Sequence, residues 1–203
     1  VQDAVIGALA EANPNLAVVF VSGNAVAMPW IDRVPAVLEA WYSGSEAGNA
    51  LADVLFGAVN PSGKLPFTFP VRLEDCSAHS AGEYPGEGQV VYRDGIFVGY
   101  RWIEKERIEP LFAFGHGLSY TTFEYGDLRP SATTLRRGEK TTVEVSVTNT
   151  GGMDGAETVH WFISDPVCRI SRPVRELKHF EKQPIRRGET RTFRFLSLIH
   201  ISE

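Results

Sequence analysis

A continuous apolar run, Leu16-Ala17-Val18-Val19-Phe20-Val21, constrains the fold of this chain more than any other stretch. The run is rich in β-branched residues and has no polar face. A strand that is apolar on both faces is typical of a parallel sheet covered by helices. The preceding residues fit this arrangement, because apolar residues recur at helical spacing from Val5 to Ala12 and Asn13-Pro14-Asn15 then ends the helix.

The same succession of signals returns further along the chain. Val37 to Tyr42 is predicted to be a second strand, and Ala47 to Phe56 a helix that follows it. Gly44-Ser45-Glu46 lies between them, and Ser45 is expected to cap the N-terminus of the helix. This alternation indicates an α/β fold over residues 1–70, the end of an open and mostly parallel sheet layered with helices.

Residues 71–125 are expected to form a connector that packs on the α/β part. Proline and glycine punctuate this stretch, and Glu74 to Gly88 is predicted to be a polar loop. Gln89 to Tyr92 and Ile96 to Ile103 have the composition of strands. The connector is therefore predicted to be mainly extended.

The next stretch, residues 126–195, changes to a hydrophobic period of two. Thr141 to Asn149 alternates most clearly, and further strands are predicted at Glu157–Ser164, Arg172–Phe180 and Glu189–Phe195. This spacing is typical of an all-β immunoglobulin-like or fibronectin type III-like sandwich. The stretch is short for seven strands, so the sandwich is expected to be incomplete.

The last eight residues, 196–203, stand apart from the rest of the chain. Their sequence, LSLIHISE, resembles the translation of a transposase adapter used in sequencing libraries. We predict a non-native tail and leave these residues out of functional reasoning. The alternative is a native strand, because apolar and polar residues also alternate here.

Composition excludes some classes of partner. The chain carries 20 Lys and Arg against 25 Asp and Glu, a formal net charge of -5, with the two signs interspersed. Nucleic acid and membrane are therefore not expected partners, and no apolar stretch is long enough to span a bilayer. Cys76 and Cys168 are expected to be free thiols, which leaves the compartment open. The cytoplasm is slightly favoured over the periplasm or secretion.

Three stretches together resemble glycoside hydrolase family 3 of the β-glucosidase type. Ala40–Gly57, continuing through Asn60–Pro66, is similar to the last strand and helix of the family's second domain. Phe112–Phe123 resembles its signature connector, and Val147–Gly151 with Arg172–Leu177 is similar to its fibronectin type III-like domain. Their order and spacing make the resemblance specific over nearly the whole chain.

The resemblance implies a retaining, exo-acting β-glycosidase, most simply a β-glucosidase that hydrolyses terminal non-reducing β-D-glucosyl residues. In this family an aspartate of a barrel domain attacks the sugar and a glutamate of the second domain acts as acid and base. The resemblance places both carboxylates upstream of Val1, so no residue of this chain is expected to be catalytic and the chain alone is expected to be inactive. The substrate, a β-glycoside or oligosaccharide, would bind through the absent barrel domain. No cofactor or metal is expected, and a homo-oligomer is compatible with the sequence.

Three residues after the second predicted strand are candidates for substrate binding. Glu46 lies at the carboxyl edge of the predicted sheet, where ligands gather in open α/β folds, but an acid in the first helical turn also stabilises the helix dipole. Trp41 and Tyr42 can stack on a sugar, although a buried strand end also takes aromatic residues. The structural and the binding roles both stay open.

Other chemistry-bearing residues are interpreted as structural. Glu83 and Glu87 lie in a glycine-rich loop that does not hold two carboxylates rigidly. Glu157 and His160 have metal-ligand spacing only on a helix, and on the predicted strand they point to opposite faces. His116, between two glycines, is expected to bond backbone at a turn.

Two other functions remain alternatives. The sandwich could be a carbohydrate-binding or adhesion module with no catalytic parent, or the parent enzyme could act on xylosides, arabinosides or N-acetylglucosaminides. An upstream barrel with a nucleophilic aspartate separates the hydrolase from the module.

Overall fold

The structure is a computed structural model that describes residues 1–82, 84–86, 88–136 and 138–198. The chain forms two compact units, and each unit is made of two segments that are separate in the sequence. The first unit comprises Val1–Phe56 and Pro66–Phe114, and the second comprises Gly57–Leu65 and the chain from Gly115 onward. Each unit is described separately below.

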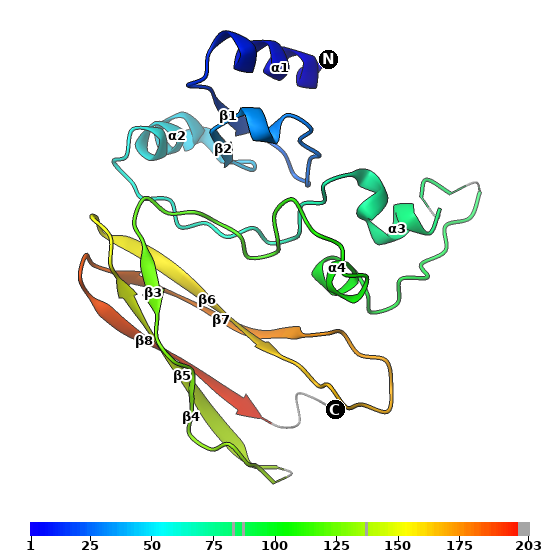
Figure 1. Cartoon of the computed structure of the whole chain (residues 1–203), viewed down its shortest axis with the longest axis vertical. Coiled ribbons are helices and arrows are strands. Elements are labelled where there is room, and N and C mark those ends of the chain that lie inside the picture. Colours follow the sequence, from blue (N-terminus) through cyan, green and yellow to red (C-terminus); the bar gives the residue numbers. More distant parts are fainter. Residues whose placement is uncertain (83, 87, 137, 199–203) are drawn as a thin grey trace. The chain divides into compact units, whose positions relative to one another are not determined.

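The first unit begins as the predicted α/β structure (Figure 1). Its elements are helix α1 (Gln2–Ala12), strand β1 (Ala17–Phe20), the 3-10 turn η1 (Ile31–Arg33), strand β2 (Ala36–Glu39), the 3-10 turn η2 (Gly44–Glu46) and helix α2 (Ala47–Leu55). Strands β1 and β2 are parallel, and their register runs from Ala17 opposite Ala36 to Phe20 opposite Glu39. The prediction of a parallel sheet with flanking helices is confirmed.

A buried tryptophan organises this part of the unit. Trp30 is 2% exposed, and its ring stacks on Phe20 of β1 with the ring centroids 5.7 Å apart. The indole N–H of Trp30 donates a hydrogen bond of 2.9 Å to the Asp3 carboxylate of α1. A buried indole needs such an acceptor. This single side chain therefore ties the first helix to the first strand.

The rest of the first unit departs from the prediction of strands. It contains η3 (Leu73–Asp75), α3 (Ser77–Ser80) and α4 (Tyr100–Lys105), so part of the predicted polar loop is helical. Residues 89–92 form no strand, and helix α4 replaces the C-terminal half of the strand predicted at Ile96–Ile103. Both strand predictions are wrong.

The reason for the error lies at Gly99. Gly99 has a φ of 57°, which redirects the chain at the start of α4. The helix buries Ile103, and the indole N–H of Trp102 donates to the backbone oxygen of Asp75 at 3.1 Å. Ile96 and Val98 stay exposed, so the residues with strand-like composition have no sheet to pack on.

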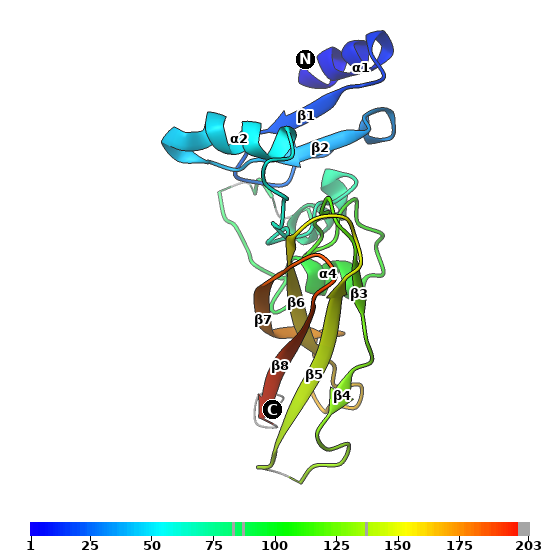
Figure 2. The ribbon, with the colours of Figure 1, turned by 90° about the vertical axis from the view of Figure 1, so that its left-hand side faces the viewer.

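The second unit contains the predicted antiparallel sandwich. Its strands are β3 (Phe123–Tyr125), β4 (Arg129–Pro130), β5 (Lys140–Asn149), β6 (Gly155–Ile163), β7 (Glu176–Ile185) and β8 (Thr190–Leu198). Strand β5 pairs with β3, β4 and β8, and β6 pairs with β7 (Figure 2). Side chains from both sheets share one core, made by Val145, Val147, Val159, Trp161, Ile185, Phe193 and Phe195.

The strand limits agree with the alternation of the sequence, with two differences. The predicted strand Arg172–Phe180 is displaced, because β7 begins only at Glu176 and continues to Ile185. Strand β8 extends through Leu198, which pairs with Lys140, into the stretch predicted to be a foreign tail. The origin of residues 196–203 stays a prediction.

The three-part division at residues 70 and 125 also stays a prediction. The boundaries of the two compact units fall elsewhere, because residues 57–65 belong to the second unit together with the sandwich. Within the described ranges, none of the helices is long and apolar enough to cross a membrane. No group of three or more His, Cys, Asp or Glu with metal-binding geometry occurs among the described residues.

Candidate functional site

The candidate residues follow β2 in a tight turn at the carboxyl edge of the parallel strands. The Ala40 N–H continues the strand pairing by donating to the Phe20 carbonyl at 2.9 Å. The Ser43 hydroxyl then donates to the Ala40 carbonyl at 2.6 Å, which closes the turn. The next residues form η2 and lead into α2. Ligands of open α/β sheets bind at this kind of edge.

Trp41 has an unusual backbone conformation within this turn. Its φ is 52°, in the left-handed region that disfavours residues other than glycine. The Trp41 N–H donates to the Glu39 carboxylate at 3.0 Å, and the indole packs edge-on against Phe67 and Phe69 at centroid distances of 5.4 Å and 6.5 Å. These contacts hold the strained residue in place. The structure thus gives Trp41 a packing role.

Tyr42 is the more accessible of the two aromatic candidates. Its side chain is 78% exposed, so the ring is available to a ligand. A Cβ at Gly23 would lie 2.9 Å from the Tyr42 ring, so a larger residue at position 23 would require this ring to shift. Sugar stacking by Tyr42 remains a prediction.

Glu46 lies directly before α2. The Glu46 carboxylate accepts a hydrogen bond of 2.6 Å from the Asn49 side chain, and both residues are exposed. An acid at this position stabilises the positive end of the helix dipole. The prediction that Ser45 caps the helix is wrong: Glu46 occupies the N-cap position, and no side chain makes a capping hydrogen bond.

The structure brings Trp41, Tyr42 and Glu46 together on one short turn, and it adds a residue that sequence reasoning missed. Glu39 ends β2, and one of its carboxylate oxygens, Oε2, is buried without a hydrogen-bond partner in the described structure. An acid at the end of a strand that is otherwise apolar was the available signal. The sequence prediction treated Glu39 as part of that strand.

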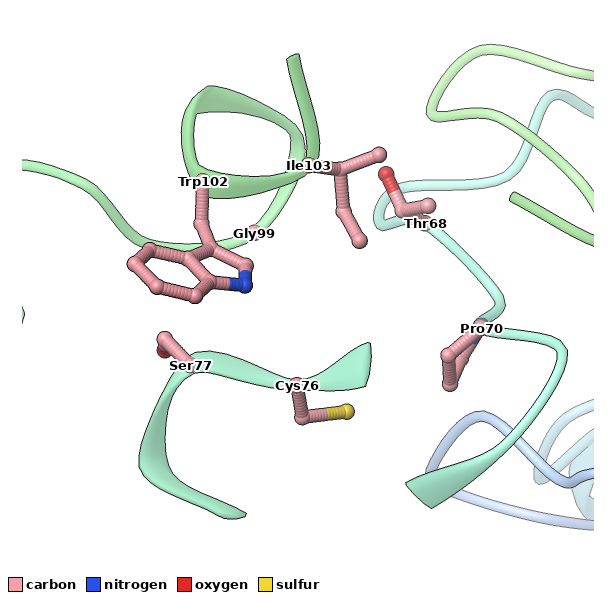
Figure 3. Close-up of a pocket in the computed structure, with 7 residues that line it drawn as sticks. All are labelled: Thr68, Pro70, Cys76, Ser77, Gly99, Trp102 and Ile103. Carbon is pink, nitrogen blue, oxygen red and sulfur yellow. The ribbon is translucent and has the colours of Figure 1, made fainter. Parts of the chain in front are cut away.

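A small hollow elsewhere in the first unit offers little to a sugar. Its volume is about 90 Å³, and it is lined by Thr68, Pro70, Cys76, Ser77, Gly99, Trp102 and Ile103. Figure 3 shows Trp102 and Ile103 facing Cys76 and Ser77 across it. Burial, and then the neighbouring Asp75, raises the pKa of the Cys76 thiol, which disfavours the nucleophilic thiolate. Pockets for ligands of moderate size are larger, about 300 Å³ or more.

The second unit contains a cluster of ionic and polar side chains around Lys64. The Lys64 ammonium lies 3.1 Å from the Glu157 carboxylate, which also accepts a hydrogen bond of 3.0 Å from the Tyr125 hydroxyl. Burial and the adjacent Glu157 carboxylate raise the pKa of Tyr125 well above its usual range. Burial, and then Lys64, lowers the pKa of both His116 and His160. Glu157 thus contacts an ammonium group and a phenol.

Two other predictions concern single residues. Glu83 and Glu87 lie outside the described residues. The backbone oxygen of His116 accepts a hydrogen bond of 2.8 Å from the Leu65 N–H. The expectation that the His116 side chain bonds backbone at a turn stays a prediction.

Comparison with known proteins gives this architecture a family. The model of the glycosyl hydrolase family 3 C-terminal domain matches residues 1–120, and that of the fibronectin type III-like domain matches residues 157–196. The chain is 48% identical over 197 residues to the beta-glucosidase BoGH3A of Bacteroides ovatus, which covers 96% of this chain and 26% of that protein. It is 48% identical over 194 residues to the probable beta-glucosidase I of Neosartorya fischeri, with 93% and 23% covered.

Solved structures agree with the sequence relatives. The beta-glucosidase from Kluyveromyces marxianus in complex with glucose superposes with a TM-score of 0.89 at 40% identity, over 98% of this chain and 23% of that one. Beta-glucosidase 3B from Thermotoga neapolitana superposes with a TM-score of 0.88 at 36% identity. This match covers 98% of this chain and 28% of that one. The chain spans about a quarter of the length of the curated relatives it matches. It belongs to glycosyl hydrolase family 3, of which it carries the C-terminal domain and the fibronectin type III-like domain.

Proposed function

We propose that the parent protein of this chain is a retaining, exo-acting β-glucosidase that removes terminal non-reducing β-D-glucosyl residues. The observation that carries the proposal is the 48% identity to a Bacteroides ovatus beta-glucosidase over 96% of the chain. The match spans nearly the whole chain and therefore includes residues of both units. The names of the fungal relatives support the same sugar.

The catalytic carboxylates are proposed to lie in parts of the parent that this chain does not contain. A retaining glycosidase needs two carboxyl groups about 5 Å apart, one ionised as the nucleophile and one protonated as the acid. Two acids that a search for such a pair would consider are otherwise engaged. Glu46 is exposed and bonded to Asn49, and Glu157 is paired with Lys64.

The first unit is proposed to supply part of the rim of the sugar site. Support comes from the position of Trp41, Tyr42 and Glu46 at the carboxyl edge of β1 and β2, where open α/β sheets bind ligands. Tyr42 offers an exposed aromatic ring, and Glu46 offers an exposed carboxylate that can accept hydrogen bonds from sugar hydroxyls. Trp41 would support the rim through its packing on Phe67.

The alternatives from the sequence are less well supported. A module with no catalytic parent does not account for a family 3 domain that matches residues 1–120, outside the sandwich. Xylose, arabinose or N-acetylglucosamine as the sugar has no observation in its favour, because the relatives named above are beta-glucosidases.

A chimera tests the proposal. The C-terminal quarter of the Bacteroides ovatus beta-glucosidase would be replaced by this chain, and hydrolysis of 4-nitrophenyl β-D-glucoside would be followed. We expect kcat/KM within about tenfold of the host, a loss of about 1.4 kcal/mol in transition-state stabilisation. The control is the host with its own segment rejoined at the same junctions. An active control beside a folded but inactive chimera, or a chimera that prefers β-xyloside, would refute the proposal.

A further inference from the structure

Residues 57–65, here called the strap, leave the first unit and fold with the sandwich. The chain enters the second unit after Phe56, returns to the first at Pro66, and enters the second again at Gly115. The strap is therefore held by residues that follow it by about fifty or more positions in the sequence. Its contacts within the second unit fall into three groups.

Asn60 forms the first group. The Asn60 side-chain amide donates to the Asp154 carbonyl at 3.0 Å, and its oxygen accepts from the Ser119 hydroxyl at 2.9 Å and the Tyr120 N–H at 2.8 Å. An asparagine side chain offers two donor hydrogens and one acceptor oxygen, and both ends are used here. One strap residue thus joins the start of β6 to the segment that precedes β3.

Lys64 forms the second group. The Lys64 ammonium donates to the Gly117 carbonyl at 2.9 Å and lies 3.1 Å from the Glu157 carboxylate. The side chains of Lys64 and Glu157 are 16% and 9% exposed. A lysine so far withdrawn from water needs both of these acceptors, because an unpaired buried charge is strongly unfavourable.

Backbone pairing and close approach form the third group. The Leu65 N–H donates to the His116 carbonyl at 2.8 Å, and the Gly115 N–H donates to the Leu65 carbonyl at 2.8 Å. A Cβ at position 117 would collide with the Gly63 carbonyl oxygen, so the strap passes where only glycine fits. The strap and residues 115–117 thus lie directly against each other.

We infer that the strap is an integral element of the fibronectin-like unit, so that this unit does not persist as an independent module once the strap is released. Release would leave Glu157 buried without its cation and would free the partners of Asn60. Both losses are expected to destabilise β6 and the segment before β3, because Glu157 and the hydrogen-bond partners of Asn60 lie there. The fibronectin-like unit is then part of the hydrolase architecture and cannot be exchanged as a separate binding domain.

Hydrogen exchange on the whole 203-residue chain tests the inference. Peptides covering β5 and β6 would be followed by mass spectrometry in the parent chain, in Lys64→Met, and in the control Lys182→Met at an exposed position of β7. We expect Lys64→Met to lower the protection of β5 and β6 on the order of a hundredfold. The control should stay within about threefold, as is usual for surface substitutions.

A milder variant covers the case in which Lys64→Met does not fold. Asn60→Ala removes the three hydrogen bonds of the Asn60 side chain and should lower the protection of β5 and β6 about tenfold or more. The inference is overturned if the strap loses protection in these variants while β5 and β6 keep theirs within about threefold. That outcome would show that the fibronectin-like unit is stable without the strap.

Discussion

Lys64 and Glu157 form an ion pair of 3.1 Å, and both side chains are largely withdrawn from water. Removing one partner of such a pair leaves a buried charge, so Lys64→Met or Glu157→Gln alone should lower the free energy of unfolding by about 3–5 kcal/mol. The double variant should lower it by less than the sum of the two. Urea denaturation of the four proteins measures this coupling.

The control for this cycle is a surface pair. Arg194 lies 2.7 Å from Glu144, but the two side chains are 68% and 39% exposed. Arg194→Met should therefore cost less than about 1 kcal/mol. If Lys64→Met and Arg194→Met lower the free energy of unfolding equally, burial of the Lys64–Glu157 pair has no energetic consequence.

Acid is expected to weaken the second unit. The folded structure lowers the pKa of His116 and His160 through burial and the nearby Lys64, with Glu157 partly opposing this at His160. Above a pH of about 6.5 both histidines are neutral in the folded and the unfolded chain. Below it the unfolded chain binds protons first, so the stability present at neutral pH is lost as the pH falls through the lowered folded pKa.

Thermal unfolding between pH 5 and pH 8 measures this effect. We expect the thermal midpoint to decrease as the pH is lowered below 6.5. The decrease should be smaller in His160→Gln, because glutamine cannot take up a proton. His79→Gln, a histidine of the first unit, is the matched control and should leave the histidine contribution of the second unit unchanged. An identical pH profile for His160→Gln and the parent would contradict the assignment to His160.

The left-handed conformation of Trp41 predicts an unusual order of variants. Trp41→Ala and Trp41→Gly both lose the packing on Phe67 and Phe69, but only glycine adopts a φ of 52° without strain. The strain for alanine is about 1–2 kcal/mol, larger than the entropic cost of glycine in the unfolded chain. Trp41→Gly should therefore be more stable than Trp41→Ala in denaturant unfolding. The reverse order would show that the turn relaxes when the indole is removed.

Tyr42 is expected to affect substrate binding rather than folding. In the chimera described above, Tyr42→Ala should raise KM severalfold with little change in the thermal midpoint, because the exposed ring has little packing to lose. Tyr92→Ala, at another exposed tyrosine, is the control. If both variants leave KM unchanged, Tyr42 is not part of the rim.

Local patterns predicted the elements that depend on local periodicity. The apolar run at β1 and the alternation at β5 each predict a strand, and both strands lie where they were expected. Helix α4 was missed because residues 96–103 are rich in β-branched and aromatic residues, and only the tertiary contacts of Ile103 and Trp102 favour a helix.

The strap could not be predicted from periodicity. Its first anchor, Asn60, bonds to a residue 94 positions away, and no pattern within the strap marks that partner. The site differs in this respect, because Trp41, Tyr42 and Glu46 are close in the sequence and could be placed together after β2. The buried oxygen of Glu39 became visible only when its surroundings were known.

The account depends on bond cleavage by two carboxylates that lie outside this chain. The most direct measurement is the hydrolysis of 4-nitrophenyl β-D-glucoside by the purified 203-residue chain, beside the chimera in the same assay. We expect turnover by the chimera and no release of 4-nitrophenol above the spontaneous rate by the isolated chain. Turnover by the isolated chain that Glu46→Gln or Glu157→Gln abolishes would contradict the account.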